Sequence, residues 1–148
     1  MRLAKIAILI AAAAFAAASY WLLYAQPANG IAEISVNGST YNVYVANTVA
    51  QQEIGLSGRS SIGDCSGFGN CAGMLFVYKN NSLLCFWMKD TRMPLEQYWI
   101  ENGIITSEGS EPVYSLNSTC NSGSMVLETA PGFPARIGQR VEIERYLS

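Results

Sequence analysis

The segment Gly73–Ile100, with the sequence GMLFVYKNNSLLCFWMKDTRMPLEQYWI, is the longest strongly apolar part of the chain outside its N-terminus. Its large aromatic side chains are of the kind that fills a protein core. Four polar residues, Lys89-Asp90-Thr91-Arg92, nevertheless follow directly after Phe86-Trp87-Met88. Charges at such a position indicate either the point where a buried strand reaches the surface or a pocket that holds them. The segment is therefore expected to supply much of the core and also indicates where a site would lie.

Short strands separated by turn residues are expected along the whole chain after residue 30. Apolar runs or apolar–polar alternation predict them at 31–36, 41–45, 74–78, 83–89, 95–101, 104–107, 112–116, 124–129 and 139–146. Asn37-Gly38 and Asn102-Gly103 are typical of tight hairpin turns. A turn is also expected at Asn80-Asn81, and the polar residues 117–123 predict a loop.

A single short helix is expected between two of these strands. Thr48, with Gln51 three residues later, has the spacing of a capping box, and residues 49–56 can form two turns that end near Gly58. Residues 57–72 are rich in glycine and serine and predict a loop. With many short strands and one helix, the fold class is all-β, an antiparallel sandwich or barrel, because a parallel sheet needs several crossover helices.

The first 25 residues form a separate region from the β domain, which is expected at 31–148 after a short linker at 26–30. Arg2 and Lys5 precede a run of about twenty residues without a charge, enough to cross a bilayer as a transmembrane helix. Positive charge on the short flank places that end in the cytoplasm, so the domain of such a single-pass protein lies outside it. A cleaved signal peptide, which would release a secreted domain, is the alternative.

The cysteines and the sequons also fit a location outside the cytoplasm. Four cysteines are an even number and predict two disulfides in an oxidising compartment. Cys65 and Cys71 share a short loop, so we pair them with each other. This leaves Cys85 to pair with Cys120. A zinc site built from the four thiolates is the alternative, but the chain has no C-x-x-C pair. Candidate N-glycosylation sequons begin at Asn37, Asn80 and Asn117.

Composition argues against several classes of function. The chain has no histidine, which is the commonest general base and metal ligand. Its formal net charge is −2 and it has no basic run, so nucleic-acid binding is not expected. No metal or other cofactor is expected either. Methionines can bind Cu(I) outside the cell, but in apolar strands they more often fill a core. The four in question are Met74, Met88, Met93 and Met125.

Four segments, in order along the chain, resemble the DUF192 (UPF0127) family: QEIGLSGR at 52–59, GMLFV at 73–77, FWMKDTRMPL at 86–95, and VLE at 126–128 ahead of Gly132. The third segment is the most specific. The resemblance covers about residues 31–144 and implies a compact β-sandwich or barrel similar to a jelly roll, without an established biochemical function. The chain departs from the family in having Asp90 where Asn is usual and in a shorter segment at 133–140.

The polar residues of these motifs, with one tryptophan beside them, are the candidate ligand-binding residues. They are Arg59, Trp87, Lys89, Asp90, Thr91 and Glu128. Glu128 shares a strand face with Val126, so it is expected to point toward an apolar region and to need a cation such as Lys89 or Arg59. Two interpretations remain open. The residues line a pocket for a small anionic or polar ligand, or they form an ion-pair and hydrogen-bond network that closes one end of a barrel.

The aromatic residues of the opening segment give a further hypothesis. Phe86, Trp87, Tyr98 and Trp99 can stack on a carbohydrate if their strands are adjacent. Such binding is common among jelly-roll domains, but that is an analogy of fold only. Aromatic residues within apolar strands are otherwise typical of a core.

Enzymatic activity has weaker support. Glu128 with Asp90 or Lys89 is the candidate acid–base group of a carbohydrate-active or other hydrolytic enzyme. The serines have no histidine to activate them. We therefore expect a membrane-anchored domain that binds a ligand or an envelope partner and has no enzymatic activity.

Overall fold

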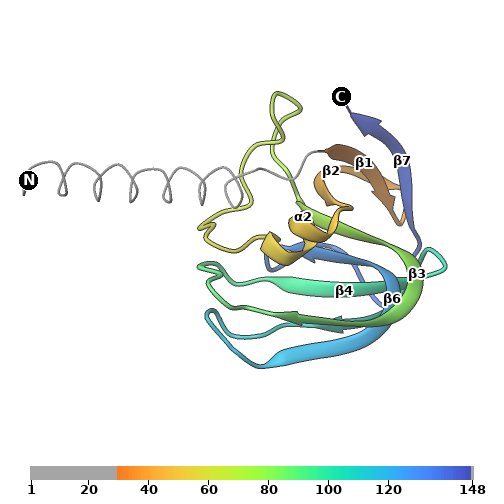
Figure 1. Ribbon diagram of the computed structural model, residues 1–148. Helices are drawn as coiled ribbons and strands as arrows, with labels where there is room; N and C mark the ends of the chain where they lie inside the picture. Colours follow the sequence, from red (N-terminus) through yellow and green to blue (C-terminus); the bar gives the residue numbers. More distant parts are fainter. Residues whose placement is uncertain (1–29, 148) are drawn as a thin grey trace, which may run out of the picture.

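A computed structural model of the protein describes residues 30–147 (Figure 1). The expected anchor or signal segment at 1–25 and all but the last residue of the linker lie outside the described residues. Within the described part of the chain, no helix is both long enough and apolar enough to cross a membrane.

The described chain folds into one seven-stranded sheet with a single short helix. The strands are β1 (Ile31–Val36), β2 (Ser39–Ala46), β3 (Gly73–Trp87), β4 (Glu96–Glu101), β5 (Ile104–Gly109), β6 (Ser118–Thr129) and β7 (Val141–Leu147), and the helix is α2 (Val49–Ile54). Across the sheet the order is β5-β4-β6-β3-β2-β1-β7. The all-β class is confirmed, with seven strands instead of the nine expected.

One neighbouring pair of strands is parallel, which corrects the expectation of a wholly antiparallel sheet. Residues 43–46 of β2 and 73–76 of β3 run in the same direction. Their connection, residues 47–72, contains α2 and a long loop, so it is long enough for the crossover that a parallel pair needs. Gln52 ties the helix to the sheet, because its Nε2 donates to the Val77 carbonyl at 2.7 Å.

The two outer edges of the sheet meet at one end and partly close it. The amide of Val141, at the start of β7, donates to the Gly103 carbonyl at 2.8 Å. The amide of Ile105 in β5 donates to the Gln139 carbonyl at 2.9 Å. Closure of this kind satisfies backbone groups that an open edge leaves unpaired.

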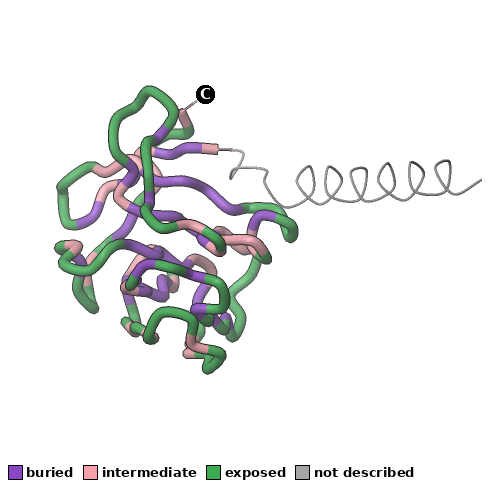
Figure 2. Tube along the Cα trace, turned by 90° about the vertical axis from the view of Figure 1, so that its left-hand side faces the viewer, coloured by how far each residue is buried: buried purple, intermediate pink, exposed green. Residues whose placement is uncertain are grey.

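Buried side chains form two cores, one on each face of the sheet. Neighbouring residues of a strand belong to different cores, as the period of a strand requires: Leu75 and Leu127 to one, Phe76 and Val126 to the other. The first core lies inside the partly closed sheet. The second is covered by α2 and by the loops that follow α2 and β3. Figure 2 shows buried residues along the strands and exposed residues along the outer loops.

The middle of β3 differs from the expectation. β3 is one strand of 15 residues, so no turn occurs at Asn80-Asn81. Its second half pairs antiparallel with residues 118–123 of β6, for which the sequence predicts a loop. The pairing shifts in register between Val77 and Ser82, and such irregularities bend a strand. Figure 1 shows β3 and β6 curving together as one long ribbon. Residues 112–116, an expected strand, form turn and irregular structure instead.

Several local signals in the sequence are confirmed. Asn37 and Asn102 lie in hairpin turns with φ of 51° and 52°, and each precedes a glycine of positive φ. Thr48 caps α2: its Oγ1 accepts from the Gln51 amide at 3.4 Å, and Gln51 Oε1 accepts from the Thr48 amide at 3.1 Å. The helix ends two residues earlier than expected, at Ile54.

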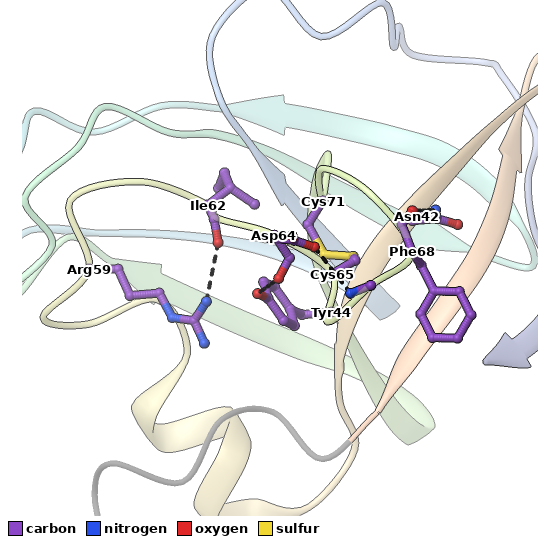
Figure 3. Close-up of a disulfide and its surroundings, with 9 residues drawn as sticks. Asn42, Tyr44, Arg59, Ile62, Asp64, Cys65, Phe68 and Cys71 are labelled. Atoms are coloured by element: carbon purple, nitrogen blue, oxygen red, sulfur yellow. Dashed lines mark hydrogen bonds between the residues drawn. A yellow bond between two sulfur atoms is a disulfide. The ribbon is translucent and has the colours of Figure 1, made fainter. Parts of the chain in front are cut away.

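Both expected cysteine pairs lie at disulfide geometry. Cys65 and Cys71, with Cα atoms 5.0 Å apart, close the loop that follows α2 (Figure 3). Cys85 and Cys120, with Cα atoms 4.0 Å apart, lie opposite each other on β3 and β6. No cysteine among the described residues is free. The pairs fit an oxidising, extracytoplasmic environment.

Candidate functional site

A cavity of about 430 Å³ opens on the face of the sheet that α2 covers. Residues 52–58, from α2 and the turn after it, line one part, and residues 89–91, after β3, line another. β3 contributes three aromatic residues and β6 contributes Glu128. Five of the six candidate residues, all except Arg59, therefore lie around one cavity, whose volume is in the range of small-molecule sites.

Glu128 is the buried acid of this cavity and is only 4% exposed. In the register of the sheet it lies between Met74 of β3 and Gln97 of β4. Gln97, which is fully buried, donates from Nε2 to Glu128 Oε1 at 3.1 Å. Within residues 30–147, no hydrogen bond to Oε2 and no ion pair of Glu128 is found. The sequence predicts the face of Glu128 correctly, but its partner is an amide rather than a cation.

The surroundings of Glu128 favour its neutral form. Burial raises its pKa from 4.5 to about 7, and the hydrogen bond from Gln97 opposes this rise only in part. Burial and the charge of Glu128 together raise the pKa of Tyr78 on β3. Near neutral pH, Glu128 is therefore present in both its ionised and its neutral form.

The two cations expected to pair with Glu128 are engaged elsewhere. Arg59 Nη1 donates to the Ile62 carbonyl at 3.2 Å, and its guanidinium lies 4.6 Å from the ring centroid of Tyr44 (Figure 3). Lys89 Nζ lies 5.3 Å from the ring centroid of Trp87. The ion pairs of the described chain are Arg140–Glu142 and Arg145–Glu33, both outside the cavity. Within residues 30–147, no ion pair joins the candidate residues, so the ion-pair part of the network interpretation is wrong, and the contacts of that network that remain are hydrogen bonds.

Backbone contacts, not side-chain ion pairs, fix the turn that carries Lys89, Asp90 and Thr91. Asp90 has φ of 57°, a left-handed conformation that Asp and Asn tolerate better than most residues. Its carbonyl accepts from the Gly58 amide at 2.9 Å, which joins this turn to the turn after α2. Thr91 is buried, and its amide donates to the Met88 carbonyl at 3.1 Å. The two motif segments thus form one side of the cavity together.

The aromatic residues divide between the cavity and the cores. Phe76 and Phe86, whose ring centroids are 4.8 Å apart, line the cavity together with Trp87, which is 52% exposed. Trp99 is fully buried, and Tyr98 belongs to the core on the other face. β3 and β4 are separated by β6, so Trp87 and Trp99 are not on adjacent strands. The four-residue stacking platform is therefore wrong, although Phe86 and Trp87 remain at the cavity.

Two important residues of the site are missed by the sequence reasoning. Gln97 is the hydrogen-bond partner of Glu128, and Phe76 lines the cavity beside Phe86. Gln97 does carry a signal, since it alternates with Trp99 along the strand, and a glutamine on a buried strand face is costly unless it is hydrogen-bonded. Its partner could not be read from the sequence, because that depends on the register between β4 and β6.

The remaining candidates lie away from the cavity. Asn37, Asn80 and Asn117 are exposed, Asn80 on strand β3 rather than in a turn. The four methionines do not gather at one place. Met74, Met88 and Met93 belong to the core that α2 covers, and Met125 packs against the other. Among the described residues, no group of three or more cysteine, aspartate or glutamate side chains could hold a metal ion.

Comparison with known proteins gives a family and a fold. The family model DUF192, described as "Uncharacterized ACR", matches residues 32–143. None of the curated proteins compared with the chain is significantly similar to it. A crystal structure from Sinorhizobium meliloti 1021, of a protein whose name proposes a transcription regulator, has a TM-score of 0.67 at 22% identity. The match covers 80% of this chain and 96% of that one.

A second crystal structure is similar in fold. It is a protein of unknown function from Novosphingobium aromaticivorans DSM 12444, with a TM-score of 0.63 at 23% identity. The match covers 76% of this chain and 84% of that one. At such identities the likeness establishes the fold alone.

Proposed function

We propose a ligand-binding function for this chain, which belongs to the DUF192 family, a family of unknown function. The cavity between α2, β3 and the turn after β3 holds a small polar ligand. The observation that carries the proposal is Glu128: this buried carboxyl group lines the cavity, its Oε1 accepts from Gln97, and its Oε2 has no hydrogen bond from the described residues and is not a buried atom sealed from the cavity. A carboxyl oxygen that is open to a cavity and has no partner in the protein is available to bind a polar group of a ligand.

The mouth of the cavity supports the same proposal. Trp87 is half exposed beside the cavity, although the rings of Phe76 and Phe86 next to it are buried. An exposed aromatic ring at the edge of the cavity offers a surface on which a ligand can stack. The ligand would therefore touch an aromatic ring at the mouth and a carboxyl group at depth.

The place of action that we propose is the outer side of a membrane. The uncharged run at 6–25 would anchor the chain, and the two cysteine pairs of the β domain fit an oxidising compartment. The expected ligand is then a small molecule of the cell envelope. The intact mass of the native protein tests the anchor. A mass that lacks the first residues would show that this segment is a cleaved signal peptide instead.

A thermal-shift panel of small envelope-derived molecules tests the binding function. We expect at least one compound to raise the melting temperature of the wild type and of Tyr146→Ala, but not of Trp87→Ala. Tyr146 is a matched control, because it is 60% exposed on β7 whereas Trp87 is 52% exposed at the cavity. A panel without a hit, or a hit that stabilises Trp87→Ala as much as the wild type, contradicts the proposal.

A second candidate function is acid–base catalysis, favoured by one observation. The pKa of Glu128 is raised to about 7, which suits a general acid or base near neutral pH, and Asp90 lines the same cavity. Hydrolysis of a glycan or ester by the wild type, lost in a folded Glu128→Gln variant, would favour the enzyme. Equal hydrolysis by the variant excludes Glu128 from that role.

A further inference from the structure

The charges around the cavity are mostly negative. Glu53, Asp90 and Glu128 line it, and Lys89 is the one cation among its lining residues. Among the described residues, no arginine lines it, because Arg59 is directed to Ile62 and Tyr44. An anionic ligand would therefore meet like charge at close range, in a site whose burial strengthens the repulsion. The charge balance favours a ligand of the opposite sign.

The cavity also contains groups that suit an organic cation rather than a metal ion. Three aromatic rings, those of Phe76, Phe86 and Trp87, line it. The face of an aromatic ring attracts an ammonium group, and Lys89 Nζ already lies 5.3 Å from the ring centroid of Trp87. A metal ion would need several oxygen or sulfur ligands, and no such group exists within residues 30–147.

We propose that the cavity binds a small organic ammonium ion, primary or quaternary, with its positive charge next to Glu128 and its alkyl groups against Phe86 and Trp87. This inference rests on the proposed binding function and names the class of its ligand. The positive charge of either ion attracts the ionised form of Glu128, and a primary ammonium group can also donate a hydrogen bond to Oε2, which has no donor among the described residues. The apolar walls can contact the alkyl groups of an amine, but they supply no ligand atoms to a metal ion.

Binding of this kind depends on pH through Glu128. The charged or titratable groups around it are Tyr78 on β3, Glu53 on α2, and Lys89 and Asp90 in the turn after β3. Glu128 is ionised above its raised pKa and attracts the cation, whereas its neutral form below that pKa does not. The affinity should therefore fall between pH 8 and pH 5.5.

Calorimetric titration of the full-length chain with three probes of similar shape tests the inference. The probes are choline, its neutral isostere 3,3-dimethylbutan-1-ol, and the anion 3,3-dimethylbutanoate. We expect choline to bind at pH 8, the alcohol to bind at least about tenfold more weakly, and the anion not to bind, because charge and cation–π attraction act on choline alone. The affinity for choline should fall by about tenfold or more at pH 5.5.

Two substitutions with matched controls locate the bound cation. Glu128→Gln should weaken choline binding by about tenfold or more, and Glu144→Gln, an exposed acid on β7, should leave it unchanged. Trp87→Ala should weaken it and Tyr146→Ala should not. Melting curves show that each variant is folded.

The outcomes separate the charge of the ligand from the binding function. If the alcohol binds as tightly as choline and Trp87→Ala abolishes both, the binding function stands and the ammonium inference is overturned. Equal affinity of choline for Glu128→Gln and wild type also overturns the inference. If choline does not bind at all, the inference fails, and the thermal-shift panel decides the binding function independently.

Discussion

Glu128 places a titratable group in an apolar cavity with a single neutral hydrogen-bond donor beside it. The raised pKa means that ionising Glu128 is harder in the folded protein than in the unfolded chain. From 4.5 to about 7, the shift corresponds to about 3 kcal/mol of folding free energy. Below pH 4.5, Glu128 is protonated in both the folded and the unfolded protein, so it costs no folding free energy. The cost grows as the pH rises, because Glu128 ionises first in the unfolded chain. It reaches its full value above pH 7.

Glu128→Gln should therefore stabilise the protein at high pH. The amide keeps the shape of the side chain and still accepts a hydrogen bond from Gln97, but it cannot ionise. We expect the variant to be more stable than the wild type by up to about 3 kcal/mol at pH 8, and similar in stability near pH 4.5. Urea unfolding of both proteins across this pH range measures the difference, and the other acids cancel in the subtraction.

If the difference in unfolding free energy between Glu128→Gln and the wild type does not change with pH, Glu128 has an ordinary pKa. A variant less stable than the wild type at pH 8 would show that the ionised carboxylate has a favourable partner after all. Either result would remove the physical basis of the site.

The sequence predicts the environment of this residue only in part. Alternation along β6 predicts that Glu128 faces the same side as Val126, because the period of a strand is local. Its partner, Gln97, lies 31 residues away and is brought near by the pairing of β4 with β6. Charge complementarity alone predicts Lys89 or Arg59, and both are engaged by aromatic rings instead.

At the scale of elements, the bent ribbon of β3 and β6 differs most from the sequence prediction. Asn80-Asn81 and residues 117–123 are polar, so they read as a turn and a loop. Each segment is nevertheless part of a long strand, and residues 118–123 pair with 82–87. The polar segment 118–123 needs no apolar pattern of its own to pair with the mostly apolar 82–87, because the backbone makes the pairing and its exposed side chains stay in water. Tertiary pairing overrides local composition here.

The two disulfides should contribute unequally to the unfolding free energy. The Cys85–Cys120 pair spans 35 residues and the Cys65–Cys71 pair spans 6. In the chain-entropy model the longer loop gains on the order of 4 kcal/mol and the shorter about 2 kcal/mol. Replacing both cysteines of a pair by serine should therefore lower the unfolding free energy more for Cys85 and Cys120.

Guanidinium unfolding of the two double variants checks this order, with intact mass after alkylation as the control. Native wild-type protein should take up alkyl groups only after reduction, and then four of them. Uptake before reduction would contradict the disulfides themselves. Equal destabilisation by the two double variants would contradict the role of loop length.

At the level of the whole molecule, the hairpins, the helix cap, the short Cys65–Cys71 loop and the all-β class are readable from the sequence, since each depends on local pattern. The Cys85–Cys120 pair follows only because the other two cysteines pair with each other. The parallel pairing of β2 with β3 and the meeting of β5 with β7 are not, because they join segments far apart in the chain. The cavity belongs to this second group. It exists only where the crossover lays α2 over the ends of β3 and β6.

A ¹³C NMR titration of the Glu128 side-chain carboxyl, with and without choline, tests whether this buried carboxyl lacks a charged partner among the described residues and is open to a ligand. We predict a pKa of about 7 in the free protein, lowered when choline is present, because a bound cation favours the ionised form. A pKa near 4.5 in the free protein, or one that choline leaves unchanged, would contradict the account.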